Sequence, residues 1–358
     1  MRRWLIAVTA LAGFAFPATA LAGTHHHAVF TLSNSTSGNR VLVFARASDG
    51  SLSPAGSAST GGAGTGTNAT SQGALALSPD GRRLYAVNTA SDTVAVFAVH
   101  GTHLRRIAVV PSGGAGPNSL TAGHGRVYVL NAGTPSVVGF WATGAGLRRI
   151  DGGARALTSA DAGPAQVSLN PAGTALAVTN TGSNTIDTIT LDRGGSIRAV
   201  RSHPSAGTTP FGFAFTRDGV LVVSDAHQAP TSAASSYRIG RGGALRLLSG
   251  PVAANELAAC WVAITGRWAF TADAGSGTIS AYHVDGRGRL HLAAAAAGDA
   301  GATSKPLDES ITPDGRFLDV LTDGLHSITT FRVGHDGSLS PVGSAAGLPV
   351  GDVGVASS

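Results

Sequence analysis

Short runs of alternating apolar and small polar residues recur along almost the whole chain, and turn residues separate them. Each recurrence contains a run that ends in an aromatic or large aliphatic residue, followed by a glycine-containing turn and then Leu or Ile. The seven run ends are Phe44, Phe97, Phe140, Ile189, Tyr237, Tyr282 and Phe331. Their spacing corresponds to a repeat of about 48 residues. Alternation with a period of two, interrupted by frequent turns, predicts β-strands rather than helices.

Two hairpins are expected in each repeat. One follows the aromatic run, as in residues 336–339, and the other precedes it, as in residues 79–81 and 313–315. Asp-Gly pairs and glycines at these points favour tight turns between antiparallel strands. Two hairpins within one period make four strands, which is the size of one propeller blade.

The first and last repeats complete each other. Only one strand, residues 28–32, precedes the first aromatic run, whereas the apolar segment 353–356 at the far end has no partner of its own. We therefore predict an all-β fold, a seven-bladed β-propeller of four-stranded blades closed by strands from both termini. Such closure leaves no sheet edge open. An open solenoid is the alternative, although its repeats are usually shorter.

The amino-terminal 22 residues have the pattern of a signal peptide. Arg2 and Arg3 precede the apolar stretch 4–16, and Ala-Leu-Ala at 20–22 is a cleavage site. We expect a secreted protein, extracellular or periplasmic, in which residues 23–358 form one propeller domain without membrane attachment. An uncleaved anchor is the alternative, but the apolar stretch is too short to span a bilayer.

Composition and charge argue against several other classes of protein. Two Glu, one Lys and one Met among 358 residues argue against long helices. The formal net charge of +5 comes without long basic runs or a nucleic-acid-binding motif, so no nucleic-acid partner is expected. The single Cys260 cannot form an internal disulfide. It is expected to be an inert buried residue, with a reactive thiol as the alternative. We expect a monomer.

The candidate chemistry lies on one face of the ring, which we call the mouth face. It carries the loops that enter the inner strands and the loops that join second to third strands. Asp308 and Glu309 precede the last full inner strand, and either is a candidate general base if burial raises its pKa. A solvated loop acid is the alternative. His227, in the long loop 227–235, is the third catalytic candidate.

Six further mouth residues are candidates for ligand binding. Lys305 offers a cation, and Phe211 with Trp261 makes one side apolar and aromatic, which suits a flat or neutral ligand. Glu256, Asn118 and Gln166 are polar residues in the same entering loops. No cofactor is expected and no cluster has zinc-ligand spacing. A Ca²⁺ held by mouth carboxylates and carbonyls is left open.

Asn or Asp is expected at the end of the second strand in six blades, most simply as a turn cap. These residues are Asn88, Asn131, Asn180, Asp225, Asp273 and Asp323. Together with the other acids of these loops they predict a negative mouth, which would repel a phosphorylated or multiply carboxylated substrate.

Residues 75–88, with Ser-Pro-Asp-Gly at their centre, and 93–97 resemble the lactonase family, which includes proteins like 6-phosphogluconolactonase and carboxymuconate cyclase. Residues 276–282 and 347–356 are similar to it as well. The resemblance implies a seven-bladed propeller and lactone hydrolysis. The family's Gly-Pro-Arg-His and Glu-Ile-His motifs are replaced here, the second by Ala-Cys-Trp-Val at 259–262, so no catalytic residue of the family carries over.

Two functions follow from this sequence. The first is hydrolysis of a neutral or sugar lactone at the mouth, with a carboxylate or His227 as base. The alternative is a non-catalytic secreted propeller that binds a glycan, small ligand or protein on the same face. A cyclase acting on a carboxylated ring is a third reading, which the acidic mouth disfavours.

Overall fold

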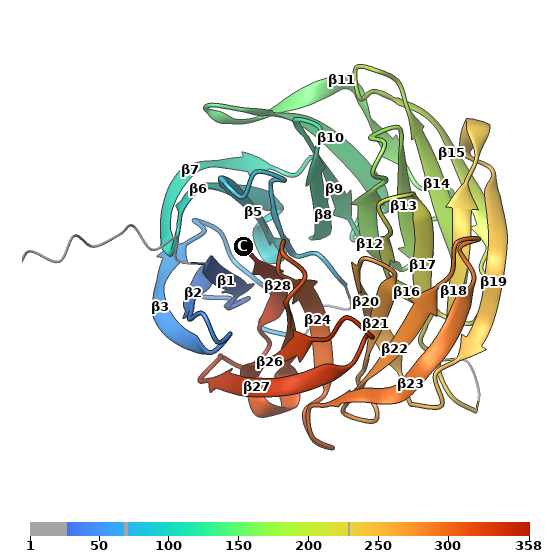
Figure 1. The fold of residues 1–358 in the computed structure, drawn as a ribbon. Coiled ribbons are helices and arrows are strands. Elements are labelled where there is room, and N and C mark those ends of the chain that lie inside the picture. The colour runs from blue at the N-terminus through green and yellow to red at the C-terminus, as the bar shows by residue number, and fades with distance from the viewer. Residues whose placement is uncertain (1–26, 68–70, 228–229) are drawn as a thin grey trace, which may run out of the picture.

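The computed structural model describes residues 27–67, 71–227 and 230–358. Its strands form a ring of seven four-stranded antiparallel sheets, as Figure 1 shows. Blade 1 holds β28, β1, β2 and β3, and blades 2 to 7 take β4 to β27 in chain order, four strands each. The predicted signal peptide, residues 1–22, lies outside the described residues. The predicted propeller is therefore confirmed.

The strands occupy four positions from the axis outward. The innermost strands are β28 (Val353–Ser357), β4 (Leu75–Leu77), β8 (Pro117–Gly123), β12 (Pro164–Leu169), β16 (Pro210–Phe215), β20 (Ala259–Thr265) and β24 (Pro306–Ile311). The second strands are β1 (His27–Leu32), β5 (Arg83–Asn88), β9 (Arg126–Asn131), β13 (Ala175–Asn180), β17 (Val220–Asp225), β21 (Trp268–Asp273) and β25 (Phe317–Thr322).

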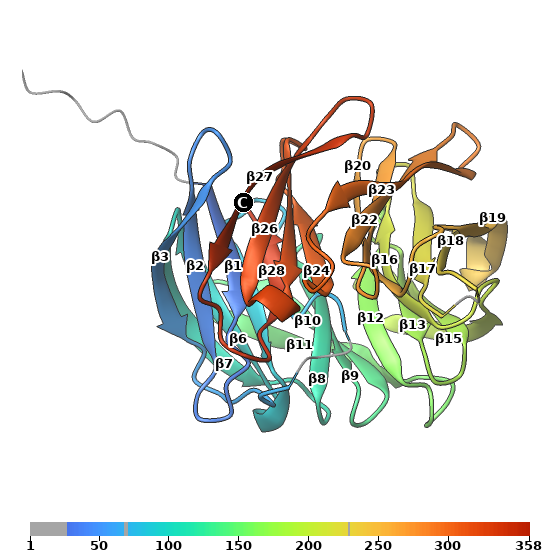
Figure 2. The same cartoon turned by 90° about the horizontal axis from the view of Figure 1, so that it is seen from below.

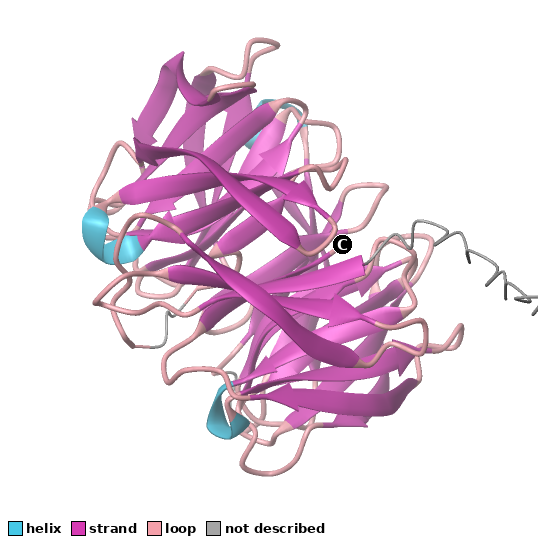
Figure 3. Ribbon diagram, turned by 90° about the vertical axis from the view of Figure 1, so that its left-hand side faces the viewer, coloured by secondary structure: helices cyan, strands magenta, loops and turns pink. Residues whose placement is uncertain are grey.

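The outer half of each blade follows the same order. The third strands are β2 (Arg40–Arg46), β6 (Thr93–His100), β10 (Ser136–Thr143), β14 (Thr185–Leu191), β18 (Ala233–Ile239), β22 (Thr278–Val284) and β26 (Ser327–Val333). The outermost are β3 (Leu52–Ser59), β7 (His103–Pro111), β11 (Gly146–Ala156), β15 (Ile197–Pro204), β19 (Leu245–Ala253), β23 (Leu290–Asp299) and β27 (Leu339–Ala346). Among the described residues, helix is confined to the short turns η1 (Thr89–Ser91), η2 (Arg241–Gly243) and η3 (Asp323–Leu325), which Figure 3 colours cyan.

The ring closes where the two ends of the chain meet. β28 pairs antiparallel with β1, with Phe30 opposite Ala356 and Thr31 opposite Val355. In Figure 1 the red last strand lies beside the blue first strand. The predicted closure, by segments 28–32 and 353–356, is thus confirmed with small changes in strand ends.

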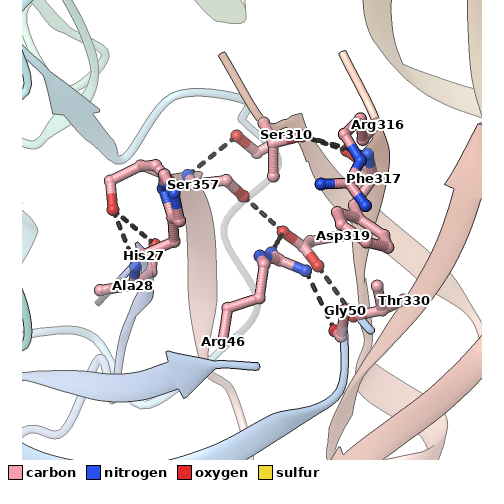
Figure 4. Close-up of polar contacts among 12 residues, drawn as sticks. His27, Ala28, Arg46, Gly50, Ser310, Arg316, Phe317, Asp319, Thr330 and Ser357 are labelled. Carbon is pink, nitrogen blue, oxygen red and sulfur yellow. Dashed lines mark hydrogen bonds and ion pairs between the residues drawn. The ribbon is translucent and has the colours of Figure 1, made fainter. Parts of the chain in front are cut away.

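A buried polar network holds this closing seam at the end opposite the mouth (Figure 4). Arg46 of blade 1 forms an ion pair with Asp319 of blade 7, and both side chains are almost fully buried. Asp319 also accepts hydrogen bonds from Thr330 Oγ1 at 2.8 Å and from Ser357 Oγ at 2.5 Å. Because Ser357 belongs to β28, one carboxylate joins the last strand, the first blade and the last blade.

The core lies between neighbouring blades, because each sheet buries both faces. The aromatic side chains that end the repeats, such as Phe97 and Tyr282, are fully buried. One apolar cluster joins Phe270 of blade 6 to Phe331 of blade 7. In the side view of Figure 2, the loops project at the two ends of the ring. No helix within the described part of the chain has the length and apolar character to cross a membrane.

Candidate functional site

Antiparallel pairing places the start of each inner strand beside the end of the second strand of the same blade. Pro164 lies opposite Asn180, and the first residue of β20 lies opposite Asp273. The loops entering the inner strands therefore share one face with the turns that follow the second strands. This arrangement is the predicted mouth face.

One hydrogen bond recurs at the mouth in five blades. The residue before the inner strand has positive φ, and its carbonyl accepts from the backbone N–H of the first residue after the second strand. The five N–H to carbonyl pairs are Ala132 to Gly116, Thr181 to Gly163, Ala226 to Thr209, Ala274 to Ala258 and Asp323 to Lys305, at 2.9 to 3.3 Å. The mouth is therefore built from one repeated turn.

This repeated turn corrects the prediction that β25 ends at Asp323. The strand ends at Thr322, and Asp323 is the first residue after it. Asp323 thus corresponds to Ala132 and Thr181, not to the strand-ending Asn131 and Asn180. The position of Gly324, which corresponds to the glycine after Ala132, is the sequence signal that would have given the right register.

The left-handed position is occupied differently in the two halves of the ring. In blades 3 and 4 it is glycine, namely Gly116 and Gly163, with φ of +61° and +58°. In blades 5 to 7 it is Thr209, Ala258 and Lys305, with φ of +58°, +55° and +46°. A residue with a Cβ loses roughly 1–2 kcal/mol in this conformation. Blades 5 to 7 therefore hold backbone strain that blades 3 and 4 avoid.

His227 also stands where other blades have glycine. Its backbone N–H donates to Thr208 at 3.4 Å, in the same turn position in which Gly182 donates to Ala162 at 2.9 Å. The imidazole is exposed, and its Nδ1 lies 3.3 Å from the hydroxyl of Thr209. His227 therefore lies at the rim of blade 5, beside one of the strained residues.

Asp308 is buried at the centre of the ring and binds three backbone amides. Its Oδ2 accepts from Gly73 N at 3.2 Å and Val355 N at 3.3 Å, and its Oδ1 accepts from Glu309 N at 2.9 Å. Burial raises the pKa of Asp308 to about 7, although these three amides oppose the shift. The carboxyl thus connects blade 7 to the closing strand and to the loop that enters β4.

Glu309 is the least satisfied group of the site. Neither of its carboxyl oxygens makes a hydrogen bond of regular geometry with a described residue. Burial raises its pKa well above the usual value, and the nearby Asp308 and Asp273 carboxyls add to the shift, while the amide of Ala263 opposes it. Asp273 is buried too, and burial with the field of Glu256 raises its pKa to about 8.

Phe211 and Trp261 pack against each other, as predicted for one side of the mouth, but below its surface. Their ring centroids are 5.1 Å apart in an edge-on contact, and the side chains are 9% and 4% exposed. The indole Nε1 of Trp261 donates to the carbonyl of Ser71 at 3.3 Å. Half-buried Cys260 and Leu307 belong to the same apolar cluster. Burial and the charge of Asp273 raise the pKa of the Cys260 thiol to about 12, which keeps it protonated.

A loop from blade 2 crosses the channel to reach this cluster. The side chain of Gln72 donates to Val262 O at 2.9 Å and accepts from Val262 N at 3.1 Å, although blades 2 and 6 are not neighbours. Ser119 Oγ donates to the carbonyl of Gln72 at 2.6 Å. The centre of the ring is therefore occupied by protein, and a ligand would meet the rim first.

Asn118 and Gln166 connect neighbouring inner strands. Asn118 Nδ2 donates to Pro164 O at 2.8 Å. Gln166 donates to Phe213 O at 2.9 Å and accepts from Phe213 N at 2.6 Å. The structure thus gives both amides a backbone partner in the next blade.

The remaining predicted residues lie at the rim of blades 6 and 7. Lys305 is exposed, and Glu256 is half-buried, with its carbonyl accepting from Ser232 N at 2.9 Å. The nine candidates thus separate into a central carboxyl pair, an aromatic pair, rim residues and two inter-blade amides. Sequence reasoning did not include Asp273 in the site, because its strand-end position is that of an ordinary turn cap.

The negative charge of the mouth is smaller than the number of acids suggests. Burial raises the pKa of Asp225 and Asp352 to about 7, as it does for Asp308. A carboxyl with such a pKa is only partly ionised near neutrality. The mouth therefore holds several carboxyls that can gain or lose a proton at neutral pH.

The open hollows lie elsewhere. Hollows of about 580 and 630 Å³ are lined by hairpin residues of the opposite face, among them Pro79, His100, Trp268 and His335. None of the nine candidates lines them. They therefore belong to the hairpin face rather than to the carboxyl site.

Comparison with known proteins agrees with this architecture. A candidate 6-phosphogluconolactonase of Bacteroides fragilis superposes with a TM-score of 0.72 at 18% identity, over 94% of this chain and 99% of that one. The periplasmic gluconolactonase of Pseudomonas aeruginosa gives a TM-score of 0.68 at 16% identity, over 91% and 98%. At such identities these similarities establish the fold. No curated protein sequence is significantly similar to the chain.

The sequence itself adds a family match. Residues 29–139 match the family described as lactonase, seven-bladed β-propeller. This segment covers blade 2, most of blade 1 and the start of blade 3. The predicted resemblance is confirmed: the chain resembles the lactonase family of seven-bladed propellers, in sequence over residues 29–139 and in fold over its whole described length.

Proposed function

We propose that the protein hydrolyses an uncharged lactone at the mouth of blades 5 to 7. The observation that carries the proposal is the buried pair Asp308 and Glu309, because Glu309 lacks a regular hydrogen bond among the described residues. A buried carboxyl without donors costs stability, and such groups are typical of functional sites. The lactonase-family match of residues 29–139 supports the choice of reaction.

The two carboxyls divide the acid and base roles. Three amides favour the ionised form of Asp308, whose pKa is about 7, so Asp308 takes a proton from the attacking water. Burial and the nearby Asp308 and Asp273 carboxyls raise the pKa of Glu309, which favours its protonated form as the donor to the lactone. Water oxygen bonds to the carbonyl carbon, the ring C–O bond breaks, and the Glu309 proton passes to the ring oxygen. The product is a hydroxy acid, and a proton returns from Asp308 to Glu309.

The surroundings favour an uncharged substrate. It would approach past Cys260 and Leu307, which are half-buried beside the aromatic pair. The carboxyls would repel a phosphorylated ring, and Lys305 is an exposed cation at the rim rather than a buried partner. Lys305 and the His227 imidazole would orient the carbonyl and hydroxyl groups of the substrate from above.

The test is acid release at constant pH from a panel of neutral sugar lactones, aliphatic lactones and one phosphorylated lactone. We expect turnover of a neutral member that falls at least about 100-fold in Glu309→Gln and Asp308→Asn. Asp336→Asn, in an exposed hairpin of the opposite face, is the matched control and should keep full activity. Equal activity of the parent and Glu309→Gln would refute the assignment.

A non-catalytic binding propeller is the second candidate. It is favoured by Gln72, which crosses the channel from blade 2 to bond Val262 of blade 6. With the channel occupied and Trp261 covered by Ser71, the accessible part of the mouth is the rim. A glycan, small ligand or protein would then bind His227, Glu256 and Lys305 without reaction. Absence of turnover on the whole lactone panel, with saturable binding of a neutral sugar lost in Lys305→Ala, would favour this function.

We also propose that the protein is exported, as a monomer. The support is the signal-like pattern of residues 1–22 together with fold similarity to a Pseudomonas aeruginosa protein named as periplasmic. Export would bring the site to external lactones rather than to phosphorylated metabolites. Fractionation with amino-terminal sequencing tests this, and an intact amino terminus in the cytoplasmic fraction would contradict it.

A further inference from the structure

Three potential metal ligands converge at the mouth end of the closing seam. Asp323 begins η3, His326 follows it, and Asp352 immediately precedes β28. One ligand atom of each residue lies within 4.8 Å of the ligand atoms of the other two. They thus bring the second-to-third-strand turn of blade 7 together with the tail that closes the ring.

The most buried of the three has no hydrogen-bond partner among the other described residues. Asp352 is 0% exposed, and no other residue in the described part of the chain donates a hydrogen bond to either of its carboxyl oxygens. The Nδ1 of His326 is likewise buried without a partner in the described chain. Buried polar atoms without a partner lower stability, and a bound ion would satisfy those of Asp352 and His326.

The backbone holds these residues in position independently of their side chains. His326 has a φ of +48°, its N–H donates to Asp323 O at 3.1 Å, and its carbonyl accepts from Gly347 N at 3.1 Å. The carbonyl beside Asp352, that of Gly351, accepts from Asn34 Nδ2 at 3.1 Å. The site is therefore preorganised, which lowers the cost of binding an ion.

We propose that Asp323, His326 and Asp352 bind a divalent transition-metal ion, with Zn²⁺ as the representative. One imidazole and two carboxylates form a mixed N,O set that suits Zn²⁺, leaving a position for water. Ca²⁺ prefers six to eight oxygen ligands, which this set does not supply. The proposal goes beyond lactone hydrolysis, since Asp308 and Glu309 are not among the ligands. The ion would secure the tail at the mouth, as Arg46 and Asp319 do at the other end.

The test measures Zn²⁺ binding by calorimetry and the change in Tm of the metal-freed full chain. His25 and His26 are replaced by Ala in every sample, so that the run of three histidines at residues 25–27 is reduced to one and does not bind the metal as a cluster. We expect one Zn²⁺ per chain, a higher Tm with Zn²⁺, and affinity at least about 10-fold lower in Asp352→Asn and His326→Gln. His124→Gln is the matched control, because His124 also has a left-handed φ of +53° but lies away from the three ligands.

Two further readouts separate lost binding from lost folding. Without metal, Asp352→Asn should melt no lower than the parent, because it removes a buried carboxyl that has no described donor. Ca²⁺ should bind more weakly than Zn²⁺. The proposal is overturned if Zn²⁺ binds the parent and Asp352→Asn equally, if no Zn²⁺ binds, or if Ca²⁺ binds more tightly.

Discussion

Blades 3 and 4 and blades 5 to 7 use the same turn at the mouth but fill it differently. Blades 2 to 4 end their second strands in Asn88, Asn131 and Asn180, whereas blades 5 and 6 end theirs in Asp225 and Asp273. The exchange of amide for carboxyl coincides with the exchange of glycine for residues carrying a Cβ at the left-handed position. One group of blades therefore keeps the repeated residues, whereas the other departs from them at the end of the second strand and at the left-handed position.

The difference distinguishes residues that the turn requires from residues that it can accommodate at a cost in stability. A buried amide stays neutral at every pH, and a glycine adopts positive φ without steric cost. Buried carboxyls and left-handed Thr209 or Lys305 both lower stability. Blades 3 and 4 build the same turn without these costs, so the turn itself does not require the residues found in blades 5 to 7. This contrast supports the choice of blades 5 to 7 in the proposed function.

The largest effect is expected from pH, because the raised pKa values belong to blades 5 to 7 and the closing tail. Asp273 has a pKa of about 8 and Asp308 one of about 7, both above the unfolded value of 3.8. Protonation of the two carboxyls in the folded protein therefore contributes fully to stability below about pH 4, and this contribution is lost as the pH rises through about 7 to 8. Each pKa unit corresponds to roughly 1.4 kcal/mol per group. Urea denaturation should give a free energy of unfolding that falls by several kcal/mol between about pH 4 and about pH 8. A free energy of unfolding that does not change with pH would contradict the burial of these carboxyls.

Exchanging one residue between the halves sharpens the comparison. Asn180→Asp places a carboxyl at a fully buried position whose Oδ1 has no described partner. If its pKa rises as that of Asp225 does, the variant should lose roughly 2–4 kcal/mol at alkaline pH and little in mild acid. The reverse change, Asp225→Asn, should gain stability in alkali. If urea denaturation shows that Asn180→Asp loses the same stability at both pH values, then packing rather than charge distinguishes the two groups of blades.

The repeat and its closure could be predicted because they depend on local patterns. Strand alternation and turn residues lie within each period, and the apolar segment 353–356 was identifiable by what the first repeat lacked. The error at Asp323 arose where a turn residue directly follows a strand, so that Thr322 and Asp323 were both plausible ends. Alternation alone does not settle a shift of one residue at a strand end.

The site itself depends on proximity across the ring, which local patterns do not encode. Gln72 reaches Val262, and Asp308 reaches both Gly73 and Val355. Sequence reasoning placed Asp308 and Glu309 at the mouth but could not show that Asp273 lies close enough to influence Glu309. Likewise, Asn118 and Gln166 are candidates as polar residues of the entering loops, and their backbone partners become visible only in the folded ring.

A smaller effect is expected at the turn position of His227. In blade 4 a Cβ on Gly182 would lie 2.6 Å from Asp161 O, so Gly182→Ala should cost roughly 1–2 kcal/mol. The corresponding hydrogen bond from His227 to Thr208 is longer, 3.4 Å against 2.9 Å, so we expect this turn to accommodate a Cβ. His227→Gly should therefore leave Tm nearly unchanged and lower only the activity on a lactone. Equal losses of Tm in both variants would remove this distinction between blades 4 and 5.

The smallest effect is expected from relieving strain in blade 6. Ala258 has a φ of +55°, and its methyl group is the least that a left-handed residue can carry beyond glycine. Ala258→Gly should raise stability by about 0.5–1 kcal/mol, since relief of the strain outweighs the greater entropy of glycine in the unfolded chain. Gly163→Ala, whose Cβ would lie 2.9 Å from Gly182 N, should lower it. If thermal melts show Ala258→Gly to be destabilising, the left-handed residues of blades 5 to 7 are relaxed, and only the buried carboxyls distinguish the two halves.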